Sequence, residues 1–240
     1  MTPEAQALLA LAVFVGFLVE ATVGFGSTLL SVALGALILP LEAFLPAVVL
    51  LNLPLSGWIL ARDHAAVDRA LLLRVAPLMA LGMPLGLALG GASPEVVGRA
   101  LGALVLGLAG FELLRPSAAG PLGRGRAAVC LLGGGVAHGL CGSGGPLAVY
   151  VAGRQLACKR AFRATLAALW VALNLLLLAG LLARGALEAR HLAPCLPLAP
   201  ALVLGLLAGE RLHARVEQAA FRRLVYGLLT LAGLVLLVRG

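Results

Sequence analysis

Apolar segments follow one another along the chain from Ala5 to Val238, with only short polar connectors between them. Hydrophobic residues make up 62% of the 240 positions and charged residues 12%, whereas soluble domains contain roughly 45–50% apolar residues. A globular protein of this composition would have no polar surface left to face water, so the bilayer must be its solvent. We therefore predict an all-α, polytopic membrane protein, a single transmembrane domain over residues 1–240 with about eight to ten membrane segments.

The net charge of +8 does not indicate a nucleic-acid partner, because the arginines collect in connectors, as they do in the cytoplasmic loops of membrane proteins. No Lys or Arg precedes the first apolar run. Since a secretory signal needs a positive leader, we expect the first segment to remain in the protein. The four cysteines form no CxxC pair and no His cluster accompanies them, so neither a metal site nor a cofactor is predicted.

Two glycine-rich stretches interrupt the apolar segments. The first is Gly24-Phe25-Gly26-Ser27-Thr28, and the second is Gly142-Ser143-Gly144-Gly145-Pro146. Such sequences break a helix and expose backbone polar groups. Inside a membrane, unwound backbone is tolerated only where protein buries it or where it lines a cavity. We therefore predict that these two breaks form the functional site.

The breaks lie at matching places in a weak internal repeat. An alignment that places Gly24 on Gly142 also places Glu20 on His138, and one further residue of shift places Gly86 on Gly205. Internal repeats of transporters are usually this weak in sequence. We predict one repeat over about residues 1–115 and a second over 127–240, joined by a Pro- and Gly-rich connector at 116–126.

The distribution of basic residues distinguishes two topologies. If one long helix crosses the membrane at each break, there are eight spans, and the 18 Lys and Arg residues divide evenly between the two sides. If each broken segment turns back, each half has five segments, and fourteen of the 18 fall on one side. Such a bias is a strong positive-inside signal. We therefore favour two inverted five-segment repeats with both termini outside.

Each break is expected to start a half-helix inside the membrane, because the arms that follow, residues 29–39 and 147–151, are shorter than the roughly 20 residues of a full crossing. A helix start presents unpaired N–H groups and a partial positive charge. Two facing starts would make a site for a small anion. The predicted substrate-binding residues of the breaks are Gly24, Gly26, Ser27, Thr28, Gly142, Ser143, Gly144, Gly145 and Pro146.

Glu20 and His138 each lie four residues before a break and are the candidates for proton coupling. Ionisable groups inside a membrane are costly and often functional, and histidine changes protonation near neutral pH. Each also has a structural interpretation, as a hydrogen-bonded neutral imidazole and as a protonated or paired packing residue. For Asn52 and Asn174, which lie within apolar segments, we predict interhelical hydrogen bonds. Arg163 either reaches the anion or flanks its segment on the cytoplasmic side.

These residues resemble the TauE/SafE family of membrane permeases, also called sulfite exporters. The match rests on the two glycine-rich stretches, on Pro40, and on Phe162-Arg163-Ala164-Thr165. The resemblance implies a multi-pass carrier in the inner (cytoplasmic) membrane for small sulfur-containing anions, such as sulfite or an organosulfonate. It also implies that Arg163 belongs to the binding site. The partners it implies are the anion and the lipid bilayer, and it leaves a homo-oligomer open.

The leading functional hypothesis is therefore a permease that works by alternating access, with proton coupling at Glu20 or His138. A membrane enzyme would need a nucleophile–base pair or a metal-ligand cluster, and the sequence shows none, so no enzymatic activity is expected. The alternative is a non-transporting membrane scaffold or assembly subunit, in which the two breaks would serve only helix packing.

Overall fold

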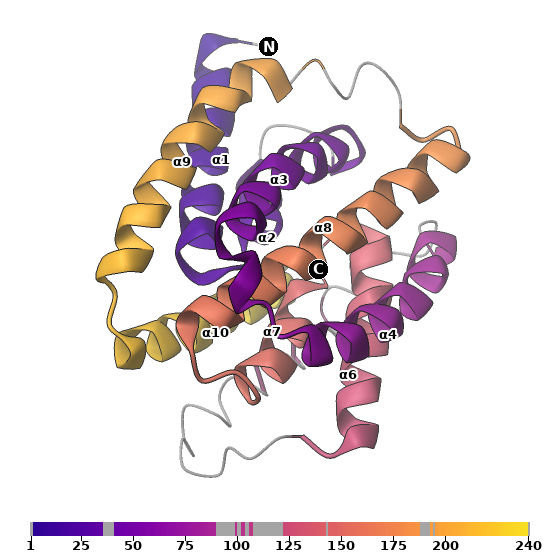
Figure 1. Ribbon diagram of the computed structural model, residues 1–240. Coiled ribbons are helices and arrows are strands. Elements are labelled where there is room, and N and C mark those ends of the chain that lie inside the picture. Colours follow the sequence, from indigo (N-terminus) through magenta and orange to yellow (C-terminus); the bar gives the residue numbers. More distant parts are fainter. Residues whose placement is uncertain are drawn as a thin grey trace.

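The computed structural model describes residues 2–35, 41–89, 122–142, 144–187 and 195–239, and the single positions 99, 102, 103, 106, 107 and 193. Within these residues the chain folds into a bundle of helices (Figure 1). In chain order they are α1 (Pro3–Val23), α2 (Ser27–Gly35), α3 (Leu41–Asp63), the 3-10 turn η1 (His64–Ala66), α4 (Arg69–Ala88), α6 (Arg124–Cys141), α7 (Gly145–Gly153), α8 (Lys159–Ala183), α9 (Cys195–Arg215) and α10 (Gln218–Arg239).

Five of these helices, α1, α3, α4, α8 and α9, are long and apolar enough to cross a membrane. Large apolar side chains also face outward on them: Leu73 and Leu81 on α4 are 74% and 71% exposed, and Leu196 on α9 is 82% exposed. Lipid is the solvent that such a surface requires. The prediction of an all-α, polytopic membrane protein is therefore confirmed. The last apolar segment of the first predicted repeat, residues 96–114, lies mostly outside the described residues, and so does Pro40.

The two predicted breaks begin with the same helix-ending geometry. α1 ends where Gly24 takes a φ of 96°, and α6 ends where Gly142 takes a φ of 64°; glycine adopts this left-handed region without steric cost. In each case the glycine N–H donates to the carbonyl four residues earlier, that of Glu20 at 2.7 Å and that of His138 at 2.8 Å. The chain then enters a short helix of nine residues, α2 or α7. Pro146 fits the first turn of α7, where no N–H is needed.

α1 and α9 run parallel and in close contact. A Cβ built on Gly205 would lie 2.8 Å from the Phe14 carbonyl oxygen, and one on Gly209 would lie 2.7 Å from that of Leu18. The residue numbers rise together along both helices, which establishes the parallel direction. Only glycine allows two backbones to come this near.

α4 and α6 pair in the same way. A Cβ on Gly82 would lie 2.2 Å from the Leu132 carbonyl oxygen, and one on Gly86 would lie 2.0 Å from that of Val136. These two helix pairs share the most extensive contacts within the described part of the chain. The contact of α1 with α9 is therefore repeated by α6 with α4, which is the pattern of an internal twofold relation between the halves.

The halves run in opposite directions. Arg163, in the first turns of α8, contacts both Asp63 at the end of α3 and Glu210 near the end of α9. The last turns of α3 and α9 therefore lie at the same end of the bundle. α4 begins at this end, because it follows α3 directly. α4 and α9 are therefore antiparallel. α6 runs parallel to α4, and α1 runs parallel to α9. α1 and α6 are therefore antiparallel as well, as inverted repeats require.

The glycines of α4 match those of α9 in a different register from the one that the sequence alignment predicted. Gly82 and Gly86 make the contacts that Gly205 and Gly209 make in the other half, so the pairing of Gly86 with Gly205 is wrong by one helical turn. The cause is a difference in length: the second half has four more residues than the first between its break and the central asparagine, Asn52 or Asn174. An alignment of the halves with one fixed offset, set at the breaks, is therefore wrong by about one helical turn at the glycines of α4 and α9.

α3 and α8 cross at the centre of the bundle (Figure 1). Asn174 Nδ2 donates to Asn52 Oδ1 at 2.7 Å across this crossing, which confirms the predicted interhelical hydrogen bond. Both asparagines are buried. The crossing places the two helices that carry them beside both breaks.

Candidate functional site

A buried polar pocket lies where the two breaks meet the crossing of α3 and α8. The space that the centre of a water-sized sphere can reach there is about 30 Å³, enough for one or two water-sized groups. The breaks touch each other at its wall, because a Cβ on Gly142 would lie 3.2 Å from the Thr28 methyl carbon. The residues that line the pocket are Glu20, Phe25, Gly26, Thr28, Leu29, Asn52, His138, Gly142, Gly145, Pro146, Trp170 and Asn174.

Glu20 lines one side of the pocket and has donors at both of its carboxylate oxygens. Oε2 accepts from the Ser27 backbone N–H at 3.1 Å and from the Ser27 hydroxyl in a short hydrogen bond. Oε1 accepts from Asn52 Nδ2 at 2.7 Å. The Ser56 hydroxyl has one hydrogen and lies 3.2 Å from Oε1 and 2.9 Å from Asn52 Oδ1, so it donates to one of the two. Donors at both oxygens suit an ionised carboxylate. Ser27, the first residue of α2, thus binds Glu20 through both its backbone N–H and its hydroxyl.

His138 lies at the equivalent place in the other half and has a different environment. It is 3% exposed, yet in the described part of the chain neither of its ring nitrogens has a hydrogen-bond partner. Its ring stacks on Trp170, with centroids 6.3 Å apart and planes 15° from parallel. Buried polar atoms are nearly always paired, so this imidazole leaves hydrogen-bonding capacity unused at the wall of the pocket.

Trp170 connects the two breaks. Its Nε1–H donates to the Gly24 carbonyl oxygen at 2.7 Å, while its ring stacks on His138 and faces Gly145, whose added Cβ would lie 3.8 Å away. One side chain on α8 therefore contacts the end of α1, the end of α6 and the start of α7.

The pocket brings together seven of the twelve residues that the sequence nominated as candidates. Gly24, Ser27 and Gly144 lie beside it: Gly24 binds Trp170, Ser27 binds Glu20, and Gly144 packs on α6, where an added Cβ would lie 2.0 Å from the Gly134 carbonyl oxygen. Ser143 lies outside the described residues. The seven that line the pocket are Glu20, Gly26, Thr28, His138, Gly142, Gly145 and Pro146.

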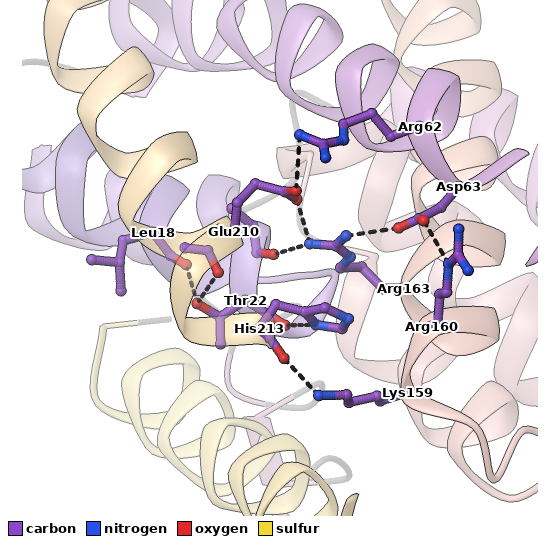
Figure 2. Close-up of polar contacts among 11 residues, drawn as sticks. Leu18, Thr22, Arg62, Asp63, Lys159, Arg160, Arg163, Glu210 and His213 are labelled. Carbon is purple, nitrogen blue, oxygen red and sulfur yellow. Dashed lines mark hydrogen bonds and ion pairs between the residues drawn. The ribbon is translucent and has the colours of Figure 1, made fainter. Parts of the chain in front are cut away.

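Arg163 lies away from the pocket lining, in a cluster of ion pairs at the end of the bundle (Figure 2). Its guanidinium donates to Asp63 Oδ2 at 2.7 Å and to Glu210 Oε1 at 2.5 Å. Arg160 donates to the second oxygen of Asp63 at 2.7 Å, and Arg62 lies 3.8 Å from Glu210. Arg163 is buried, and its charge is shared between two carboxylates from two different helices.

The same cluster pairs the free carbonyls at the end of α1 (Figure 2). Arg163 donates to the Ala21 carbonyl oxygen at 2.8 Å, and His213 Nδ1 lies 2.7 Å from that of Thr22. Lys159 Nζ does the same at the end of α9, for the carbonyls of His213 and Val216. Cationic and N–H donors are favourable at helix C-termini. The contacts of Arg163 are thus those of a structural residue that holds the end of α1, where the first break begins.

Sequence reasoning did not place Trp170, Asn52 and Asn174 in the pocket. The two asparagines stand out in the sequence, since polar residues within apolar segments are unusual, but the sequence predicts only interhelical hydrogen bonds for them. Trp170 gave no signal, because a tryptophan in an apolar helix usually indicates packing. Within the described ranges, no three His, Cys, Asp or Glu side chains gather in a way that could hold a metal ion.

Membrane-length helices, two broken segments and a buried polar pocket between them define a multi-pass membrane protein built like a secondary transporter. The comparison with known families agrees: the chain belongs to the sulfite exporter TauE/SafE family, whose model matches residues 8–236. It is therefore a membrane transporter of the sulfite-exporter type, acting on a small anion in a lipid bilayer. No curated protein and no solved structure matched the chain.

Proposed function

We propose that this protein carries sulfite or a compact organosulfonate across the cytoplasmic (inner) membrane, and that the anion binds in the pocket between the breaks. One observation supports this most directly: two helix starts, from halves that run in opposite directions, converge on one buried polar pocket. Helix starts direct N–H groups at anions: the first N–H of α2 binds the Glu20 carboxylate, and the start of α7 has no side-chain cap. Gly26, Gly142 and Gly145 line the pocket and leave room for backbone to approach a ligand closely.

Alternating access is the mechanism that the inverted halves favour. Because each half resembles the other turned over, a conformation that opens the pocket to one side has a counterpart that opens it to the other. Glu20 and His138 are the titratable groups among the lining residues, so proton coupling is assigned to them. The small free space favours a compact anion.

The test is flux of labelled sulfite and labelled methanesulfonate into proteoliposomes, with protein-free liposomes as the leak control. Asn174→Leu keeps the volume of the side chain and removes its polar atoms from the pocket. We expect it to slow the flux about tenfold, as for a lost hydrogen bond worth about 1.4 kcal/mol. Leu175→Ala, on the exposed face next to it, is the matched control and should transport normally.

If well-folded protein moved neither anion, the transport proposal would be overturned and the scaffold alternative would gain support. If Asn174→Leu and Leu175→Ala transported equally well, transport would stand but the assignment of this pocket would not.

A further inference from the structure

We infer that the pocket binds a monovalent anion together with one proton carried by His138, so that the loaded carrier crosses the membrane with no net charge added. The inference rests on the proposed function, because it takes the pocket as the anion site. It adds the charge of the substrate, the group that carries the proton and the electrical character of transport.

The hydrogen bonds along the pocket have a fixed direction. Glu20 accepts from the Ser27 backbone N–H, from the Ser27 hydroxyl and from Asn52 Nδ2, so Asn52 turns its NH₂ group toward the carboxylate. Asn52 Oδ1 then faces Asn174, and Asn174 must donate through Nδ2, as the distance of 2.7 Å indicates. Asn174 Oδ1 is left over, buried and without a hydrogen-bond partner among the described residues.

Among the described residues, three buried polar atoms around the pocket therefore remain unpaired: Asn174 Oδ1 and both ring nitrogens of His138. A sulfonate offers only acceptors, and Asn174 Oδ1 is also an acceptor. A neutral imidazole has one N–H and cannot serve both. A protonated imidazole has two, one for Asn174 Oδ1 and one for the anion, and every atom is then satisfied. Asn174 and His138 line the same pocket.

The charges around the pocket lead to the same conclusion. Glu20, on α1, is the other titratable group among the described lining residues, and these include no Lys or Arg. The residues that reach the pocket from α3 and α8 are uncharged, and so is Met83 of α4, which packs against α6. An anion bound beside neutral His138 would put two uncompensated negative charges in a buried space, which is strongly unfavourable.

A proton on His138 offsets one negative charge and no more. A monoanion with one proton restores the charge of the unloaded pocket, whereas a dianion would leave an additional negative charge. The ligand class is thus a monovalent sulfur oxyanion, a sulfonate or hydrogensulfite, and not the sulfite dianion.

The first test uses methanesulfonate in proteoliposomes with an entrapped pH indicator. Methanesulfonate is the anion of a strong acid, so every proton that moves with it belongs to the carrier. We expect one proton to enter per anion, and a flux that follows the pH gradient but does not change when a potassium diffusion potential is imposed. His138→Gln stays polar but cannot carry the proton, so anion-linked proton entry should disappear. His64→Gln, at an exposed histidine, should behave as wild type.

The second test measures equilibrium binding and needs no change in the pocket. The chain has two tryptophans, so Trp58→Phe leaves Trp170, stacked on His138, as the only fluorophore of its kind. Protonated imidazole quenches a stacked indole. Methanesulfonate should therefore shift this quenching to higher pH, by about one unit for each tenfold preference of the anion for the protonated form.

The outcomes separate the two proposals. If neither methanesulfonate nor sulfite crosses the membrane, the proposed function and this inference both fail. If either anion crosses but is driven by voltage, or carries no proton, or leaves the Trp170 titration unmoved, only this inference fails. It also fails if sulfite crosses while methanesulfonate neither crosses nor binds.

Discussion

Trp170 links the two breaks through its hydrogen bond to Gly24 and its stack on His138. Trp170→Phe would keep an aromatic ring for the stack on His138 but remove the N–H that binds the Gly24 carbonyl oxygen. A buried carbonyl that loses its donor costs about 1–3 kcal/mol. We expect a loss of stability in this range, together with slower anion flux, measured by thermal unfolding and by proteoliposome uptake.

Trp58→Phe is the matched control for this variant, because Trp58 is 45% exposed on α3. It should change neither measurement. If the two Phe variants were equally stable and equally active, the hydrogen bond to Gly24 would not hold the first break in place.

At the residue scale the sequence was informative where a residue was out of place. Glu20, His138, Asn52 and Asn174 are polar within apolar runs, and all four line the pocket. Their partners could not be predicted, since hydrogen bonds such as that from Asn52 to Glu20 join positions far apart in the chain. The split between a fully bonded Glu20 and an unpaired His138 is visible only in the folded protein.

Among the elements, the α6–α7 break offers a controlled comparison. Gly142 and Gly185 both have a positive φ, 64° and 66°, so alanine at either position meets similar backbone strain, about 1–2 kcal/mol. A Cβ at Gly142 would also lie 2.8 Å from Leu45 Cδ1, whereas one at Gly185 has nothing within 4 Å. We expect Gly142→Ala to slow the flux strongly and Gly185→Ala to leave it nearly unchanged.

Flux and thermal unfolding measured on both alanine variants separate strain from function. Equal flux in the two would mean that the contact of Gly142 with α2 and α3 has no part in transport. A loss in Gly142→Ala alone, in folded protein, would support a role for the packing between the breaks.

Helices were predictable as elements because apolar length, glycine and proline mark them locally. Both breaks occur at the predicted residues. The register between the halves was harder to predict. Gly86 corresponds to Gly209 and not to Gly205, because the segment between the break and the central asparagine is four residues longer in the second half. A difference of this kind does not show in residue periodicity.

In the molecule as a whole, the Arg163 cluster joins the end of α1 to α3, α8 and α9 (Figure 2). Arg163→Met would leave Asp63 and Glu210 without their buried cation, which typically costs about 3–5 kcal/mol. We expect a large loss of thermal stability. Arg62→Ala removes a cation that is 60% exposed and 3.8 Å from Glu210, and should cost less than about 1 kcal/mol.

If Arg163→Met were as stable as Arg62→Ala, the cluster would not be structural. If instead Arg163→Met were stable but no longer bound the anion, Arg163 would belong to the binding site, as the family resemblance implies.

The orientation in the membrane can be tested with cysteine labelling. Cys158 is exposed in the basic connector before α8, and Gly185 follows the other end of that helix. The positive-inside bias places Cys158 in the cytoplasm. With the other cysteines replaced, a membrane-impermeant maleimide should label Cys158 only in inside-out vesicles, and Gly185→Cys in a Cys158→Ser background only in intact cells. Labelling of Cys158 from outside would reverse the predicted orientation.

The pairing of α1 with α9 and of α4 with α6 has a consequence for the ancestry of the chain. α1 of the first half packs on the glycines of α9 in the second half, and α6 of the second half packs on the glycines of α4 in the first. Each half therefore needs the other to bury these helix faces. A half-length ancestor would have had to insert into the membrane in both orientations and pair with an inverted copy of itself. Gene fusion would then have fixed one orientation for each half. Freed from sharing one sequence, the halves could diverge, leaving a carboxylate at Glu20 and an imidazole at His138.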